Sequence, residues 1–196
     1  MIVRAAREGD LPALAALQDA NLLTNIAPEV QSEQGFVTTP YAPDTMRLFI
    51  ARSGAFVAEQ DGEVVGYAFA GAWHLYDTWP IFPYMVSRLA ELPPFAGVPV
   101  IAENSFQYGP VCVAEPARGR GVPTALFAHV RASYAPRFPL GVTFINKRNT
   151  RSLAAHQRKL GFAVIDEWSY GAESFYSLAF TTRDTSDTIS ANESIL

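Results

Sequence analysis

The stretch Pro110–Thr124, which reads PVCVAEPARGRGVPT, constrains the fold of this chain more than any other part of the sequence. A β-rich apolar run, Val111–Val113, leads into a loop that contains Gly119 and Gly121, and apolar periodicity resumes directly after the loop. Glycines at such a strand-to-helix junction let several backbone N–H groups converge, and the following helix adds the positive end of its dipole. The junction is therefore expected to bind an anion, most often a phosphate group.

Two arginines in this loop, Arg118 and Arg120, would add charge-assisted hydrogen bonds to the same anion. The loop is not a P-loop, because the sequence lacks the Gly-Lys-Ser or Gly-Lys-Thr ending of that motif. The dinucleotide fingerprint G-x-G-x-x-G is incomplete, because Thr124 stands where the third glycine is required. The next predicted strand leads into Asn146 and Lys147 rather than an acidic ribose ligand, so a nucleotide-dependent oxidoreductase is not expected.

Composition limits the class of protein. With 196 residues, of which 49% are hydrophobic and 17% charged, the chain fits one soluble globular domain. The sequence has neither an apolar run of roughly 20 residues nor a secretory signal, so we expect a cytoplasmic protein without membrane contact. The net charge of −4, with basic residues concentrated only at 118–159, makes nucleic acid an unexpected partner. We predict one domain over 1–180 and a mobile polar tail over 181–196.

Periodicity and turn signals predict the other elements. The strongest local signals are a helix capped by Asp10, a hairpin that turns at Asp61-Gly62, and a helix that ends at Gly161. The predicted strands cover residues 2–4, 55–59, 63–70, 100–113, 141–145, 162–166 and 174–180, and further helices cover 44–52, 84–92, 123–133 and 149–160. Residues 24–43 are predicted to be a loop. The aromatic and proline-rich segment 73–99 is either the wall of a cleft or a satellite core under a long loop.

A second informative stretch, residues 146–162, reads NKRNTRSLAAHQRKLGF. Helical spacing places Asn149, Ser152, His156 and Lys159 on one face of the predicted helix. This stretch follows the glycine loop by about thirty residues.

Together the two stretches resemble motifs A and B of the GNAT superfamily of N-acetyltransferases. Motif A, R/Q-x-x-G-x-G/A, is similar to Arg118-x-x-Gly121-x-Pro123, in which a proline without an N–H replaces the last small residue. Motif B, N-x-x-[AS]-x-x-x-[YH] followed by L-G-F, is similar to the segment from Asn149 to Phe162.

Motif B departs from the family pattern at one position. Counted from Asn149, His156 takes the position where many members have Tyr, whereas counted back from Gly161 the same position falls on Gln157. The order of the predicted strands and helices matches the GNAT order over most of the chain.

The resemblance implies a mixed α/β (α+β) fold, in which helices flank a mostly antiparallel central sheet that splays open at the cofactor site. It implies acetyl-CoA or another acyl-CoA as cofactor, with the pyrophosphate on residues 118–124 and the pantetheine along the backbone of Val111 and Val113. The pantetheine would lie between that strand and the strand at 141–145. The cofactor-binding residues implied in this way are Val111, Val113, Arg118, Gly119, Arg120, Gly121, Val122, Thr124, Asn149 and Ser152.

Family-type chemistry is direct attack of an amine on the thioester. We name Glu103 as the candidate base, with an ordinary solvated glutamate as the alternative. We name His156 as the candidate acid for the leaving thiolate, because its ordinary pKa near 6.5 suits proton transfer. The alternatives are a helix histidine that packs beside Leu153 and Leu160, or one that contacts the cofactor without proton transfer. Tyr108 and Tyr176 are alternative acids that the sequence does not place.

Two other chemistries are not expected. Cys112 lies between valines in a strand, where a thiol usually behaves as a small hydrophobic group with a raised pKa, so a covalent acyl-enzyme is not predicted. The histidines show no metal-ligand spacing, so we predict no metal.

The leading hypothesis is therefore an acetyl-CoA-dependent N-acetyltransferase that acts on a small-molecule amine. Segment 73–99 would form part of the acceptor wall. The alternative is a catalytically weak acyl-CoA-binding or sensing module with the same fold. Either a monomer or a homodimer is compatible with the sequence.

Overall fold

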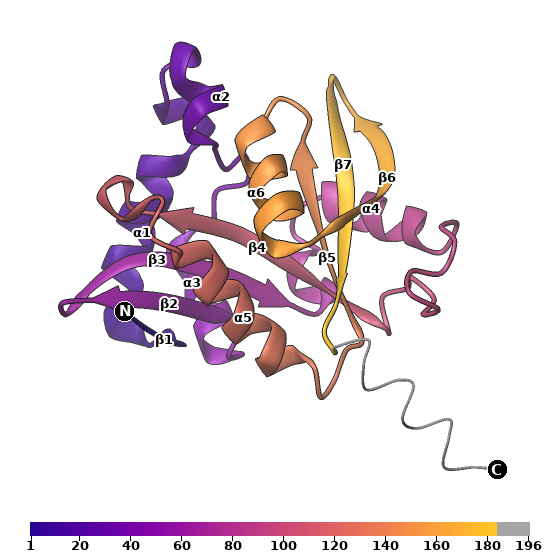
Figure 1. The fold of residues 1–196 in the computed structure, drawn as a ribbon, viewed down its shortest axis with the longest axis horizontal. Helices are drawn as coiled ribbons and strands as arrows, with labels where there is room; N and C mark the ends of the chain where they lie inside the picture. Colours follow the sequence, from indigo (N-terminus) through magenta and orange to yellow (C-terminus); the bar gives the residue numbers. More distant parts are fainter. Residues whose placement is uncertain (184–196) are drawn as a thin grey trace.

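The computed structural model describes residues 1–183, which form a seven-stranded sheet with the strand order β1-β2-β3-β4-β5-β7-β6 (Figure 1). The strands are β1 (Ile2–Ala5), β2 (Ala55–Gln60), β3 (Glu63–Gly71), β4 (Ser105–Val113), β5 (Leu140–Asn146), β6 (Ala163–Tyr170) and β7 (Glu173–Thr181). Neighbouring strands run antiparallel except β4 and β5, which run parallel. The predicted mixed, mostly antiparallel sheet is confirmed.

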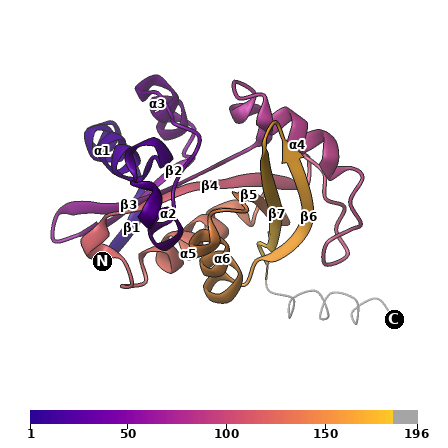
Figure 2. The same cartoon turned by 90° about the horizontal axis from the view of Figure 1, so that it is seen from above.

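Helices cover both faces of this sheet (Figure 2). They are α1 (Leu11–Asn21), α2 (Gln31–Gln34), α3 (Pro43–Ala51), α4 (Ile81–Leu89), α5 (Val122–Tyr134) and α6 (Thr150–Leu160). Helices α1, α3 and α4 lie on one face, and α5 and α6 lie on the other. No helix within residues 1–183 is long and apolar enough to cross a membrane.

Each face buries its own hydrophobic core. Helices α1, α3 and α4 contribute apolar residues such as Leu14, Phe49 and Met85 to the first core. The second core contains Leu126 of α5 and an aromatic cluster that includes Phe106 and Phe180. Since α5 and α6 share this second core, its packing fixes how both helices sit on the sheet.

The parallel pair β4 and β5 separates soon after it forms. The two strands pair only over Ser105–Gln107 of β4. Gly109, with φ of 108°, follows two residues later, and the register of β4 with β3 shifts at the same place, between the pairs Ala70–Tyr108 and Ala68–Val111. Beyond this point β4 remains paired with β3 while β5 pairs with β7, so the strands diverge (Figure 1). The predicted splay is confirmed.

Several boundaries differ from the predictions. Helix α4 begins three residues earlier than the predicted start at 84, because Pro80 and Pro83 fit its N-terminal turn. Strand β4 begins at Ser105 rather than at 100, because the preceding residues close a turn in which the Asn104 N–H donates to Ile101 O at 3.1 Å. The predicted loop 24–43 contains the short helix α2.

The side chain of Asp10 does not cap α1 as predicted. Its Oδ2 accepts the Arg7 N–H at 2.8 Å and the Arg4 guanidinium at 2.7 Å, so it closes the turn before α1 instead. The pKa of Asp10 lies below its ordinary value, mainly because of the hydrogen bond from Arg4.

At the C-terminal end, β7 runs to Thr181, and the buried Thr182 hydroxyl donates to Phe138 O at 2.6 Å. The rest of the predicted tail, 184–196, lies outside the described residues.

Candidate active site

The open edge of β4 supplies one wall of the site. The Ala114 N–H donates to Val65 O at 2.9 Å, toward β3. Because backbone groups of an antiparallel pair alternate in direction, the N–H and C=O groups of Val111 and Val113 face away from β3, into the splay. The family resemblance implied these two residues as the edge along which the pantetheine would bind.

The glycine loop supplies free N–H donors at the head of α5. Gly119 and Gly121 have φ of 78° and 81°, which a glycine adopts without strain. No acceptor in the described part of the chain takes the N–H of Gly119, Gly121, Val122 or Thr124. These donors, together with the dipole of α5, make an anion site.

The close approach of α5 to the sheet depends on Gly66 in β3. A Cβ added at Gly66 would lie 2.8 Å from Val122 Cγ1 and 3.0 Å from Cys112 O. Val122, the first residue of α5, is fully buried at this contact. Its side chain therefore anchors the head of the helix while its backbone N–H remains free.

A cavity of about 420 Å³ lies between the β4 edge, the glycine loop and α6. Eight of the predicted cofactor-binding residues line it: Val111, Val113, Arg118, Gly119, Gly121, Thr124, Asn149 and Ser152. We call this space the cofactor cavity. Arg120 and Val122 do not line it, because Arg120 is exposed on the loop and the Val122 side chain points into the core.

The predicted polar face of α6 lines the cofactor cavity. Asn149, Ser152, His156 and Lys159 all contribute to it. Both polar atoms of the Asn149 amide make hydrogen bonds: its Oδ1 accepts the Ser152 N–H at 3.2 Å, and its Nδ2 donates to Phe36 O at 2.8 Å. Asn149 therefore caps α6 and holds a distant loop, a role that the sequence did not reveal.

That loop roofs the cavity. Gln34, Gly35, Phe36 and Val37 line the cofactor cavity, and Arg151 Nη1 donates to Glu33 O. The loop is also tied to the end of α1, where the Val37 N–H donates to Asn21 O at 2.8 Å. No periodicity marks this segment, and only the contacts from α6 define its position.

His156 lies where the cofactor cavity meets a second cavity. Its Nδ1 is 2.8 Å from Ser152 O, so Nδ1 carries the proton and donates to this carbonyl, and Nε2 is the free acceptor nitrogen. Burial lowers the pKa of His156 below its ordinary value. The imidazole is therefore neutral with Nε2 free to accept a proton, so His156 would have to take up a proton at Nε2 before it could act as the acid for the leaving thiolate.

The lowered pKa of His156 predicts a pH dependence of stability. Below about pH 6.5 the unfolded chain binds a proton at this residue more readily than the folded chain. The free energy of unfolding should therefore decrease as the pH falls from 6.5 toward 5, with a slope from this residue of at most about 1.4 kcal/mol per pH unit. Denaturant unfolding of His156→Gln at a series of pH values should show a smaller slope than unfolding of the wild-type chain. Equal slopes for wild type and His156→Gln would contradict the neutral assignment.

Tyr108 lies beside His156, with ring centroids 6.0 Å apart in an edge-to-face arrangement. It lines the cofactor cavity, and its buried hydroxyl has no hydrogen-bond partner among the described residues. Burial raises the pKa of this hydroxyl, so Tyr108 remains protonated and can donate. The other tyrosine considered, Tyr176, lines neither cavity and instead packs against Lys147 Nζ, 4.7 Å from the ring centroid.

The second cavity, of about 100 Å³, opens inside the splay between β4 and β5. We call it the acceptor cavity. It shares with the cofactor cavity the residues Phe36, Val37, Val111, Asn149, Ser152 and His156. Two ligands bound in the two cavities would therefore meet beside His156.

Glu103 is not part of this arrangement. It lies exposed in the turn before β4, and Leu140, at the start of β5, hydrogen-bonds to the neighbouring Asn104. Both cavities lie toward the opposite, C-terminal ends of β4 and β5, and Glu103 lines neither. The geometry therefore argues against Glu103 as the base.

Segment 73–99 mainly builds the core. Trp73, Tyr76 and Phe82 are all buried, and only Phe82 lines the acceptor cavity. Several other wall residues, including Tyr41 and Gln107, were not selected in the sequence analysis. The one sequence signal that could have identified such a wall residue is a polar side chain within a buried strand, as at Gln107.

The groups that line the cofactor cavity match the parts of an acyl-CoA. Free N–H donors and Arg118 stand at one end, an unpaired strand edge runs along it, and Arg151, Arg158 and Lys159 of α6 line the opposite side. Phosphate groups match the free N–H donors with Arg118 at one end and the basic residues of α6 on the opposite side. An extended amide chain matches the unpaired strand edge.

Comparison with known proteins agrees with this arrangement. A model of the acetyltransferase (GNAT) family matches residues 22–162. No curated protein gives a significant match.

Solved structures share the fold. A ribosomal-protein-alanine N-acetyltransferase from Brucella melitensis superposes with a TM-score of 0.59 at 24% identity, covering 92% of this chain and 99% of its own. An N-acetyltransferase from Staphylococcus aureus Mu50 gives 0.59 at 19% identity, with 93% and 98% covered. The Salmonella typhimurium protein yncA, solved with its cofactor acetyl-CoA, gives 0.60 at 17% identity, with 93% and 94% covered. The family model matches more than half of this chain, and the chain therefore belongs to the acetyltransferase (GNAT) family.

Proposed function

We propose that the protein is an N-acetyltransferase that transfers an acetyl group from acetyl-CoA directly to the amine of a small molecule. The observation that carries the proposal is the junction of the two cavities at His156. Family membership supports acyl transfer, and the acetyl-CoA bound by the Salmonella neighbour supports the choice of cofactor.

Binding roles follow from the lining of the cofactor cavity. The N–H groups of Gly119, Gly121 and Thr124 would hold the pyrophosphate, and the Val111 and Val113 backbone would pair with the pantetheine amides. When bound, acetyl-CoA supplies an activated acetyl thioester. Placing amine and thioester side by side can lower the barrier by ~7–11 kcal/mol, more than one acid or base provides.

Proton transfer is assigned to two side chains. The His156 Nε2 lone pair would accept the proton that the amine nitrogen loses as the new C–N bond forms. The Tyr108 hydroxyl, which has no partner within residues 1–183, would donate a hydrogen bond to the leaving sulfur. His156 then returns its proton to that sulfur, so the products are a neutral amide and a thiol.

The test is amine-dependent release of free CoA thiol from acetyl-CoA, with the acetylated product identified by mass spectrometry. We expect release that depends on both the amine and the enzyme. Binding of acetyl-CoA without turnover of any amine would support the weak acyl-CoA-binding module instead.

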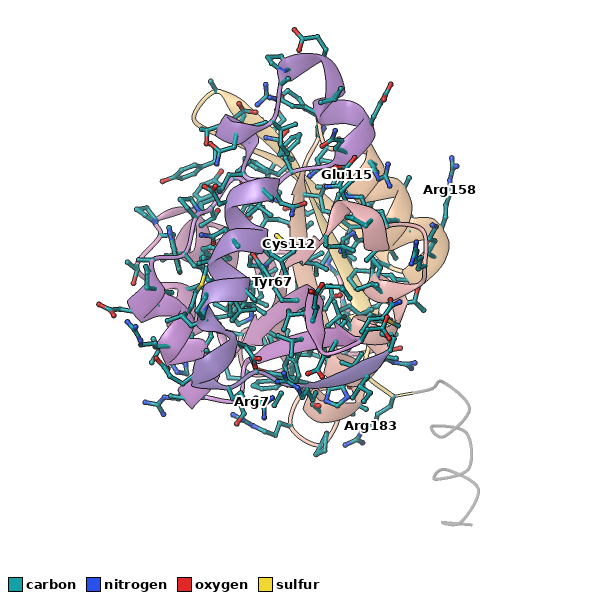
Figure 3. All side chains as sticks on the ribbon, turned by 90° about the vertical axis from the view of Figure 1, so that its left-hand side faces the viewer. Arg7, Tyr67, Cys112, Glu115, Arg158 and Arg183 are labelled. Carbon is teal, nitrogen blue, oxygen red and sulfur yellow. The ribbon has the colours of Figure 1, made fainter. Side chains whose placement is uncertain are left out.

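A prediction concerns Cys112, the one thiol of the chain. Cys112 is 1% exposed, its thiol hydrogen-bonds to Tyr67 at 3.0 Å, and both side chains lie in the interior (Figure 3). Burial raises its pKa to about 12, so it is not a nucleophile at neutral pH. Cys112→Ala should keep kcat within about twofold and lower the free energy of unfolding by on the order of 1 kcal/mol. Loss of turnover together with unchanged acetyl-CoA binding would indicate an acyl-enzyme route.

A further inference from the structure

We infer that the acceptor cavity takes a weakly basic amine carried on an uncharged aromatic ring, with Gln107 accepting a hydrogen bond from its N–H. The inference rests on the proposed function and names its substrate class.

The first observation is the lack of ionised groups. Among the described residues that line the acceptor cavity there is no Asp, Glu, Lys or Arg. Beyond its wall, Glu173 already accepts from Asn146 Nδ2 at 2.8 Å and pairs with Arg148 at 3.0 Å. An ammonium that entered would lose its hydration without a carboxylate to compensate, and a carboxylate or phosphate on the ligand would find no cation.

The second observation is the shape and chemistry of the walls. Four aromatic side chains line the acceptor cavity: Phe36, Tyr41, Phe82 and Phe144. Phe82 and Phe144 meet edge to face, with ring centroids 5.2 Å apart. The volume of about 100 Å³ is somewhat below the roughly 150 Å³ of a protein cavity that holds one benzene ring. A six-membered ring would therefore fill this space, and its far end would extend toward the cofactor cavity, with which the acceptor cavity shares six lining residues.

The third observation is an unused acceptor on Gln107. This residue is 3% exposed, and its Nε2 donates to Tyr108 O at 3.1 Å, which fixes the orientation of the amide. Its Oε1 has no partner within the described residues. Since a buried carbonyl without a donor is costly, an N–H of the acceptor amine is the group that would satisfy it.

This substrate class also suits the proton acceptor that is present. An aromatic amine is neutral at pH 7, so it needs no prior deprotonation by a strong base. It loses one proton as the C–N bond forms and the C–S bond breaks, and the neutral imidazole of His156 can carry that proton to sulfur.

The experiment compares two isomeric amines, para-toluidine and benzylamine, with the full chain and acetyl-CoA. At pH 7 we expect kcat/KM to be at least about tenfold higher for para-toluidine. Between pH 7 and 9 the kcat/KM of para-toluidine should stay constant. The kcat/KM of benzylamine should rise by up to about tenfold per pH unit, because the fraction of benzylamine present as the free base rises. Adding a carboxylate to the ring, as in para-aminobenzoate, should reduce kcat/KM by about tenfold or more.

Gln107→Leu should lower kcat/KM for para-toluidine by about tenfold while leaving the Kd of acetyl-CoA unchanged. Gln157→Leu, at an exposed position of α6 that lines neither cavity, is the matched control and should have no effect. Acetyl-CoA binding accompanied by preferred acetylation of benzylamine at pH 7, or by no acetylation of para-toluidine, would overturn the inference. Failure to bind acetyl-CoA would instead overturn the proposed function.

Discussion

Gly121→Asp is expected to weaken acetyl-CoA binding at least a hundredfold without unfolding the protein. Gly121 occupies the N-cap position of α5 with φ of 81°, and a Cβ added there meets no atom within 4 Å. Aspartate is favoured at N-caps and tolerates a left-handed conformation, so the fold should accept it. Its carboxylate would occupy the anion site and repel a phosphate, and one such pair at 4 Å costs about 4 kcal/mol at an effective dielectric constant of 20.

Two variants separate charge from backbone strain. Gly121→Asn has nearly the same size without the charge and should weaken binding much less. Gly171→Asp introduces the same residue at φ of 60° in the β6–β7 turn, also with no atom within 4 Å, and should bind normally. Isothermal titration provides the Kd values. A Kd for Gly121→Asp within threefold of wild type would place the pyrophosphate elsewhere.

Of the single substitutions discussed, Gly141→Ala is expected to lower the free energy of unfolding the most. A Cβ at Gly141 of β5 would lie 2.0 Å from Phe180 Cζ and 2.4 Å from Cε1, so it would overlap the end of the aromatic ring. Phe180 is 4% exposed and packs 4.4 Å from the Phe162 ring centroid, so it has little room to move. Overpacking of this kind costs about 3 kcal/mol, which for a chain of this size lowers Tm by about 6–12 °C.

A smaller residue at 180 should relieve this clash. The double variant Gly141→Ala/Phe180→Leu is expected to be more stable than the sum of the two single losses predicts. Gly9→Ala, where a Cβ meets no atom within 4 Å, is the control and should leave Tm within about 2 °C of wild type. An unchanged Tm for Gly141→Ala would show that the Phe180 ring moves freely.

Local sequence patterns predicted the parts of the site that depend on neighbours in the chain. The strand, glycine loop and α5 follow one another directly, and helical spacing alone aligns Asn149, Ser152 and His156. The splay was implied by the family resemblance, and it begins where β4 is irregular, at Gly109 with its φ of 108° and at the register shift against β3.

The rest of the site depends on distant contacts. The hydrogen bond from Asn149 to Phe36 joins residues 113 positions apart, and it sets the roof of the cofactor cavity. Glu103 was assigned to a strand, but a turn closes at Asn104 and leaves Glu103 at the wrong end of β4. The sequence could not predict that His156 is neutral before it accepts a proton, because burial, which lowers its pKa, is a property of the packed fold.

The most direct test of the central claim, that the cofactor cavity binds acetyl-CoA, is thermal unfolding with acetyl-CoA, CoA or NAD. A ligand at a hundredfold excess over its Kd stabilises the folded state by about 2.7 kcal/mol, which corresponds to a rise in Tm of about 5–10 °C here. We expect this rise with acetyl-CoA and CoA and none with NAD, and we expect Gly121→Asp to remove it. An unchanged Tm with acetyl-CoA and CoA, or an equal rise with NAD, would contradict the account.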